Sequence, residues 1–220
     1  MGPRRYADRA EAGHVLAAEL AGTIQPPCVV AGIPRGGVIV ALPIAVRFGC
    51  PLAVSFVRKV SLESAPELAA GVIDEDGHFE ADPLVLRSLG ATDADLDAAR
   101  ARVLREIARQ KAAFRAPDLR ALLPGAVAVL VDDGLATGWT MRAAIALARR
   151  HGAGRIVVAV PYAADSTAHE IESRADALVC PWVDDAFYAV GAGYVDFGAT
   201  GDDEVREALA RAAAGVRSDV

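Results

Sequence analysis

The apolar run Ala126–Val131 constrains the fold more than any other segment of the sequence. Its six residues show no polar alternation, and an acidic turn and a helical pattern follow it directly. Such a run is typical of a parallel strand that is covered on both faces. Because parallel neighbours need crossover connections, which are usually helices, the run predicts an α/β fold. We expect a mainly parallel central sheet flanked by helices.

The rest of the chain repeats this alternation of strand and helix. Short apolar runs predict further strands at 28–33, 52–57, 156–160 and 177–180. Helical spacing of apolar residues predicts helices at 6–21, 38–48, 140–151 and 166–174. Since no repeat or linker divides the chain, we expect residues 1–220 to form a single domain.

One stretch departs from the alternation. Residues 60–70 have little periodicity and are expected to form a loop. Residues 71–80 are a hairpin candidate with an Asp-Gly pair at the middle. A long helix is predicted at 92–114, where a Thr and an Asp three residues later resemble a capping box. We expect residues 71–115 to be an inserted hairpin and helix.

Composition and charge narrow the possible functions. The chain has 220 residues, of which 53% are hydrophobic, and no segment approaches the roughly 20 apolar residues of a membrane span. Acidic residues outnumber basic ones by 29 to 23, and the only lysines are Lys59 and Lys111. This balance provides no broad basic face for sequence-independent nucleic-acid binding.

The three cysteines, Cys28, Cys50 and Cys180, are widely spaced, and no CxxC motif or His/Cys cluster accompanies them. An odd number at this spacing disfavours a disulfide framework and a zinc site. The charged, amphipathic N-terminus has no apolar core of a signal peptide. We therefore expect buried, reduced thiols in a cytoplasmic protein.

The turn after the predicted strand at 126–131 contains the candidate ligand-binding residues. Ligands of open parallel sheets bind beyond the carboxyl ends of the strands, where Asp132 and Asp133 lie. Two carboxylates can accept hydrogen bonds from a vicinal diol or bind a hard cation. The following turn opens a helix, and its amides, with the hydroxyls of Thr137 and Thr140, suit an anion. Together they suit a ribose 5-phosphate.

Other readings of this turn are tested by the sequence. A P-loop needs a lysine before its Ser or Thr, and no lysine follows Lys111. The dinucleotide fingerprint GxGxxG is absent, and a phospho-receiver domain would need the acid pair near its start and a later lysine. The remaining alternative is an ordinary turn in which Asp132 and Asp133 only cap the helix.

Residues 127–141, VAVLVDDGLATGWTM, resemble the phosphoribosyl pyrophosphate (PRPP) signature of type I phosphoribosyltransferases. The resemblance implies that family's fold, with Asp132 and Asp133 holding the ribose hydroxyls and contacting Mg²⁺ through PRPP. It assigns the 5-phosphate to Ala136, Thr137, Gly138, Trp139 and Thr140. It extends over residues 4–206, whose order of motifs is similar to a stand-alone bacterial group of this family.

Two further stretches resemble the same family. Gly32–Gly37, with the sequence GIPRGG, is similar to its pyrophosphate loop, where Arg35, Gly36 and Gly37 would bind PRPP. Glycines allow close approach of backbone amides to a phosphate, and arginine supplies paired donors. Arg58 and Lys59 resemble the pair that precedes the mobile catalytic loop. Arg35 and Lys59 are therefore the expected catalytic residues. The alternatives are a Gly-rich turn and a solvated lysine.

The aromatic-rich stretch at 187–197 loosely resembles the base-binding hood of purine phosphoribosyltransferases, which we place at 181–200. Phe187 would stack on the base with Asp196 nearby, and Trp182 is a second stacking candidate. Packing of a C-terminal subdomain explains the aromatics nearly as well. Ala136 stands where 6-oxopurine enzymes carry an Asp, which favours adenine-type or unassigned members.

The resemblance implies transfer of a phosphoribosyl group from PRPP to a nitrogenous, purine-like base, with release of pyrophosphate. It implies Mg²⁺ as the cofactor, a role in nucleotide salvage, and a homodimer. An alternative is a non-catalytic regulatory protein that binds PRPP or a nucleotide on the same fold. A third reading, an RNA-binding regulator, is disfavoured by the acidic balance and the scarcity of lysines.

Overall fold

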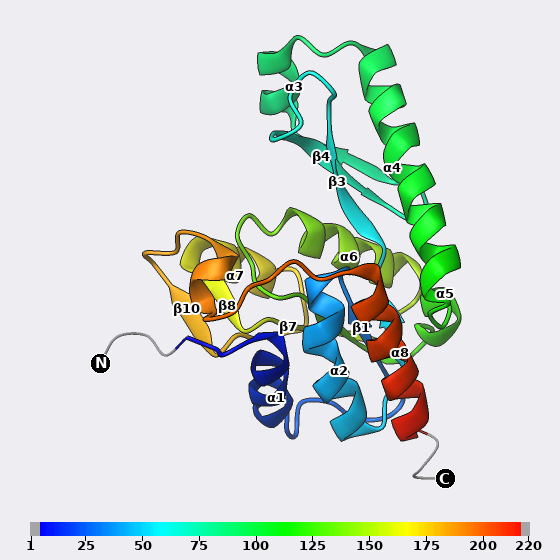
Figure 1. The fold of residues 1–220 in the computed structure, drawn as a ribbon, viewed down its shortest axis with the longest axis vertical. Coiled ribbons are helices and arrows are strands. Elements are labelled where there is room, and N and C mark those ends of the chain that lie inside the picture. Colours follow the sequence, from blue (N-terminus) through cyan, green and yellow to red (C-terminus); the bar gives the residue numbers. More distant parts are fainter. Residues whose placement is uncertain (1–4, 217–220) are drawn as a thin grey trace.

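The computed structural model describes residues 5–216 and has a parallel five-stranded sheet at its centre, in the order β2-β1-β6-β7-β9 (Figure 1). The strands are β1 Cys28–Gly32, β2 Leu52–Val54, β6 Val127–Val131, β7 Arg155–Ala159 and β9 Ala177–Val179. All four pairings are parallel, which confirms the predicted α/β class. β6 is the middle strand, because its uninterrupted apolar run suits a position buried on both faces.

Helices cover both faces of this sheet. One face carries α1 Arg9–Glu19, α2 Gly36–Phe48 and α8 Asp202–Val216. The other carries α5 Leu119–Leu122, α6 Trp139–Arg150 and α7 Asp165–Glu172. Alternate residues of β6 point to opposite faces: Val129 and Val131 pack in the first layer, and Ala128 and Leu130 in the second. These four side chains are fully buried, as the sequence predicts.

The predicted hairpin and long helix are both present, and they extend away from the central sheet (Figure 1). The elements are β3 Val57–Ser61, β4 Ala69–Asp74, β5 Phe79–Ala81, α3 Pro83–Leu89 and α4 Asp93–Phe114. The three strands form a separate antiparallel sheet. The capping box of α4 is also confirmed, since Thr92 and Asp95 exchange hydrogen bonds.

Two predicted boundaries in this region are wrong. The strand expected at 52–57 ends at Val54, and Val57 already belongs to β3. The loop expected at 60–70 is confined to 62–68, because β3 and β4 pair up to Ser61 and Ala69. The cause is non-local: antiparallel pairing with β4 draws the polar Arg-Lys segment into a strand, which local periodicity does not reveal.

A third small sheet joins β8 Tyr162–Ala164 to β10 Trp182–Asp184, and neither strand was expected. The chain near its N-terminus pairs with the segment after β10. The amide of Tyr6 donates to the carbonyl of Gly193 at 2.9 Å, and the amide of Val195 donates to the carbonyl of Tyr6 at 2.8 Å. Residues 5–8 are thus fastened to the segment expected to form the hood.

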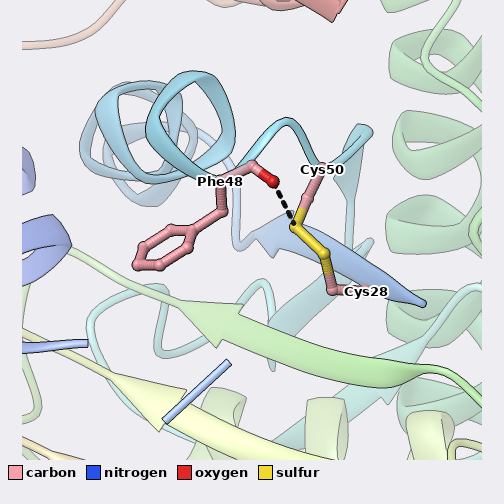
Figure 2. The surroundings of a disulfide bond; sticks show 3 residues. All are labelled: Cys28, Phe48 and Cys50. Atoms are coloured by element: carbon pink, nitrogen blue, oxygen red, sulfur yellow. Dashed lines mark hydrogen bonds between the residues drawn. A yellow bond between two sulfur atoms is a disulfide. The ribbon is translucent and has the colours of Figure 1, made fainter. Parts of the chain in front are cut away.

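The expectation that all cysteines are reduced is wrong for two of them. Cys28 and Cys50 form a disulfide, and Figure 2 shows the sulfur of Cys50 beside the carbonyl oxygen of Phe48, at 3.7 Å. The two residues are 22 positions apart in sequence. They meet because β1 and β2 are adjacent parallel strands that start at the same edge of the sheet. Cys180 is a free thiol whose pKa is raised by burial to about 11.

Among residues 5–216, no helix is both long enough and apolar enough to cross a bilayer.

Candidate functional site

The acid pair and the Gly-rich loop lie side by side at the carboxyl edge of the central sheet. β1 and β6 pair in register, so Gly32 lies beside Val131, and the amide of Ile33 donates to the carbonyl of Val131 at 2.8 Å. The loops that leave these two strands therefore begin together. The sequence predicted that each loop follows a strand, and the parallel pairing of β1 with β6 in the structure makes the two loops neighbours.

Two glycines allow the start of α2 to touch the acidic turn. A Cβ on Gly37 would lie 2.6 Å from the carbonyl oxygen of Val131 and 2.9 Å from the Cα of Asp132. A Cβ on Gly36 would lie 2.0 Å from Oδ2 of Asp133. Any side chain there would push the two loops apart. The peptide between Pro34 and Arg35, just before these glycines, is cis.

The carboxyl group of Asp132 is electrostatically unfavourable in its charged form. Burial raises its pKa well above the usual range, and the neighbouring charge of Asp133 adds to the effect. The amide of Asp133, which donates to Oδ1 of Asp132 at 2.9 Å, and the charge of Lys59 only partly oppose this. Hydroxyl donors or a cation at Asp132 would relieve the cost, because both favour a carboxylate.

Arg9 contacts the acid pair directly and was missed by sequence reasoning. Its Nε donates to Oδ2 of Asp133 at 2.8 Å, and its side chain is only 13% exposed. The local sequence presents Arg9 as one charge on an amphipathic helix. The two residues are 124 positions apart, so no local signal could have found the contact. Tyr194 was also missed, and its hydroxyl donates to the carbonyl of Asp133 at 2.7 Å.

The turn after the acid pair leads into an open helix start. Gly138 has a left-handed backbone, with φ of +70°, and no side chain caps the first turn of α6. The carbonyl of Ala136 is engaged by the hydroxyl of Thr167 at 2.7 Å, which fixes the turn from α7. Thr137 is exposed, and Thr140 is half-buried. An uncapped helix N-terminus flanked by two threonines is suited to bind an anion.

Arg142 supports the aromatic side chain at this helix start. Its guanidinium lies 4.2 Å from the ring centroid of Trp139 and donates to both carboxyl oxygens of Glu170, at 3.0 and 3.2 Å. The face of Trp139 is thus held by a cation that is itself paired. These contacts join α6 to α7 beside the turn.

Two of the basic residues expected to bind pyrophosphate lie close to polar side chains of α8 and α4. Nη1 of Arg35 lies 3.6 Å from Oδ1 of Asp202 on α8, too far for a hydrogen bond, and the Arg35 side chain is 48% exposed. Nη1 of Arg58 donates to the side-chain oxygen of Gln110 on α4 at 2.9 Å. Arg109 joins the two helices, since it pairs with Asp202 at 2.8 Å.

Lys59 is exposed and borders a pocket of about 690 Å³ between residues 61–66 and α4. Its charge acts on Asp132, so the two residues share one electrostatic environment. The pocket lies under the loop at 62–68, which we expect to be the mobile loop. The exposed side chain of Lys59 therefore borders the pocket beside the loop at 62–68.

The two residues expected to contact the base have separate supports. The half-buried ring of Phe187 lies 4.7 Å from the ring of Tyr162, which also packs against Trp182 at 4.1 Å. Asp196 is exposed, and its Oδ1 accepts from the amide of Gly198 at 3.0 Å. It borders a pocket of about 240 Å³ together with Arg9. Phe187 thus packs in an aromatic cluster, while Asp196 is engaged by a neighbouring backbone amide.

A second acidic cluster lies in the turn between β4 and β5. Asp74, Asp76 and His78 are the one group of three metal-ligating side chains close enough to share an ion within residues 5–216. Oδ1 of Asp74 already accepts two backbone amides at 3.0 Å, and its Oδ2 pairs with Arg150. The carboxylate oxygens of Asp74 and Asp76 are therefore engaged by backbone amides and by side chains of the protein. It serves as a connection between the hairpin and α6.

Comparisons with known proteins show the family to which this chain belongs. The sequence model described as "Phosphoribosyl transferase domain" matches residues 9–196, and the chain belongs to that family. Two Mycobacterium tuberculosis proteins, provisionally named phosphoribosyl transferases MT0597 and Rv0571c, are 42% identical to it over 207 residues. That match covers 94% of this chain and 47% of each relative, so the chain spans about half of their length.

A solved structure is also similar along nearly its whole length. The crystal structure of TT1426 from Thermus thermophilus shares 38% of its residues with this chain and has a TM-score of 0.76. The similarity covers 94% of this chain and 98% of that one. The inserted hairpin and long helix fall within the matched length, since few residues of either chain lie outside it.

Proposed function

We propose that this protein transfers the 5-phosphoribosyl group of PRPP to a nitrogenous base and releases pyrophosphate. The observation that carries the proposal is the meeting of three features at one edge of the sheet. They are the acid pair at Asp132 and Asp133, the uncapped start of α6, and the loop at Gly36 and Gly37 that lies directly against the acid pair. Each matches one part of PRPP: the ribose hydroxyls, the 5-phosphate and the pyrophosphate, respectively.

The proposed reaction is a substitution at C1 of the ribose. The bond between C1 and the pyrophosphate oxygen breaks, and pyrophosphate leaves with the electron pair. A nitrogen of the base forms the new bond to C1 and loses its proton. Arg35, Arg58 and Lys59 would stabilise the negative charge that grows on the leaving group, which is the largest contribution such residues make.

The acid pair also fits the divalent cation that this family uses. Asp132 and Asp133 are hard oxygen donors, and the raised pKa of Asp132, caused by burial and then by Asp133, supports a site that a positive charge would stabilise. Bound Mg²⁺ would neutralise charge on the pyrophosphate. These two carboxylates would hold it by way of PRPP.

We propose a purine-like acceptor without a 6-oxo group. At the position where 6-oxopurine enzymes carry an Asp, this chain has Ala136, whose carbonyl is taken by Thr167. Phe187 is the proposed stacking residue, since its ring is fixed on Tyr162 rather than freely rotating. Asp196 is a weaker candidate, because its carboxyl group already accepts a local amide. A salvage role, a cytoplasmic location and a homodimer complete the proposal.

The test is pyrophosphate release from PRPP and Mg²⁺ against a panel of purine and pyrimidine bases. We expect release that depends on one class of base and that Asp133→Asn abolishes. Saturable PRPP binding without release from any base would contradict the transferase and favour a PRPP-binding regulator. Size-exclusion chromatography with light scattering on the same samples would check the proposed dimer.

A further inference from the structure

We propose that Arg9 is a positioning residue for the ribose site. It orients the carboxylate of Asp133 and offsets its charge, so that Asp133 can accept ribose hydroxyls beside a polyanionic ligand. This inference rests on the proposed function, since it concerns the same ligand. Arg9 lies outside every motif that marks the site in the sequence, and only the fold brings it there.

Three contacts fix the guanidinium of Arg9. Its Nε donates to Oδ2 of Asp133 at 2.8 Å, and its Nη1 donates to the carbonyl of Gly198 at 2.8 Å. Its centre also lies 4.0 Å from the ring centroid of Phe197. A planar guanidinium held at two edges and one face has little rotational freedom, so the carboxylate that it contacts is also held.

The pair is enclosed, which sets it apart from a surface ion pair. The side chains of Arg9 and Asp133 are 13% and 18% exposed. A Cβ on Gly36 would lie 2.7 Å from Nε of Arg9 as well as 2.0 Å from Oδ2 of Asp133. The proposed pyrophosphate loop therefore passes directly over this pair, and α1, the start of α2 and the end of β6 meet at it.

Charge gives Arg9 its second role. PRPP carries several negative charges, and two adjacent carboxylates would repel it. The charged and titratable groups around the pair come from several elements: Asp132 next to it, Lys59 on β3, Arg9 on α1 and Tyr194 in the candidate hood. Arg9 is the cation in direct contact, so its loss leaves Asp133 facing the ligand with an uncompensated charge.

The contacts of Arg9 with Phe197 and Gly198 add a connection to the candidate hood segment at 181–200. That segment is also tied to the N-terminal residues through the ring of Tyr6, 5.8 Å from the ring of Tyr194. Arg9 therefore joins ribose-binding and base-binding parts of the site through one side chain. A change at Arg9 should affect the ribose end directly and leave the anion loop at Arg35 in place.

The experiment measures binding of two fragments of PRPP by calorimetry, ribose 5-phosphate and inorganic pyrophosphate, each with Mg²⁺. The variants are Arg9→Gln, Arg9→Lys, Asp133→Asn and the double variant Arg9→Gln/Asp133→Asn. Arg47→Gln, at an exposed position on α2, is the matched control. Thermal unfolding of every variant is recorded in parallel.

We expect Arg9→Gln to weaken ribose 5-phosphate binding about tenfold and to leave pyrophosphate binding within twofold of the wild type. Arg9→Lys should recover part of the loss, because lysine restores the positive charge but cannot make both hydrogen bonds of the guanidinium, to Asp133 and to Gly198. In the Asp133→Asn background, Arg9→Gln should cost little, since the two residues act as a unit. The control variant should bind both fragments normally.

Unchanged ribose 5-phosphate binding in Arg9→Gln would overturn the inference, and so would equal weakening of both fragments or full additivity in the double variant. If Arg9→Gln does not fold, Arg9→Lys and the control decide the same question. Failure of the wild type to bind either fragment would instead contradict the proposed function. The two failures are therefore distinguishable.

Discussion

Two turns of this protein contain adjacent acidic residues, but the pKa of the carboxyl group is raised in one turn and lowered in the other. Asp132 and Asp133 follow a central strand, and residues 74–76, Asp-Glu-Asp, follow a strand of the inserted hairpin. Around the hairpin turn, cations from three helices pair with the acids: Arg150 on α6, Lys111 on α4 and Arg120 on α5. The ring of His151 adds a hydrogen bond to Asp76 at 2.7 Å. At the first turn, Arg9 is the single cation hydrogen-bonded to the pair within the described chain.

The pKa shifts express this difference. Burial raises the pKa of Asp76, but the hydrogen bond with His151 and the charges of Arg120, His151 and Arg150 bring it below its ordinary value. The pKa of Asp132 is raised by burial and by Asp133. The charged form of Asp76 is thus stabilised by neighbouring protein groups. The charged form of Asp132 is not, and hydrogen-bond donors or a cation would stabilise it. A ligand would supply such donors or such a cation.

The largest expected effect distinguishes the cations near the two turns. Arg35→Gln should lower the rate of pyrophosphate release by about a hundredfold, because it removes a donor to the leaving group. Arg120→Gln should leave that rate within about twofold, since Arg120 is 2.6 Å from Asp76 and serves the hairpin turn. Initial rates at saturating base give the comparison. Equal losses in both variants would contradict separate roles for the two turns.

A pair of glycine substitutions tests the geometry of the two turns. Gly36→Ala should weaken ribose 5-phosphate binding by at least about tenfold, since its Cβ would collide with Asp133 and Arg9. Gly77→Ala lies in the hairpin turn with φ of +84° and open space around it. It should cost about 1 kcal/mol of stability and no binding. Calorimetry and thermal melts separate the two outcomes; normal binding by Gly36→Ala would argue against the close approach.

Neutral substitutions of one carboxylate in each turn should change stability in opposite directions. Asp76→Asn should lower the free energy of unfolding by about 1–2 kcal/mol, because it weakens hydrogen bonds between charged groups. Asp132→Asn should raise the melting temperature of the ligand-free protein at pH 7, because it removes a carboxylate that burial disfavours. Differential scanning calorimetry measures both. A less stable Asp132→Asn variant would mean that the pair is a structural cap.

The smallest expected effect is the pH dependence of the stability that Asp76 and Asp132 contribute. A carboxyl group with a lowered pKa stabilises the fold above its ordinary pKa near about 4, and this contribution is lost as pH falls further. Asp76 should follow that course. Asp132, with a raised pKa, favours the fold when protonated, so its cost fades on acidification. The melting temperatures of wild type and Asp132→Asn should therefore converge as the pH falls from 7 toward the ordinary carboxyl pKa near about 4.

The sequence predicted the parts of the molecule that depend on local pattern. The unbroken apolar run of β6 indicated a central parallel strand, and the Thr92–Asp95 spacing indicated the start of α4. The sequence also indicated that the loop at Arg35 and the acid pair each follow a strand, but the adjacency of those strands comes from the structure. The side-chain roles expected at those positions remain predictions for the experiments above.

What the sequence could not provide depends on contacts between distant segments. Arg9 reaches Asp133 across 124 positions, and the pairing of β3 with β4 moved Arg58 and Lys59 into a strand. Cys28 and Cys50 looked unrelated until adjacent strands brought them together. Such contacts depend on how whole helices and strands pack together, and a short window of sequence carries no information about that packing.

The disulfide turns the first strand and helix of the sheet into a covalently closed ring. Its junction at Cys28 and Cys50 lies at the amino edge of the sheet, and the Arg35 loop lies within the ring, at the carboxyl edge. Closing a ring of this size removes conformations from the unfolded chain rather than from the folded one. The covalent link therefore stabilises the fold from the edge of the sheet opposite the Arg35 loop, and it places no bond at the loop itself.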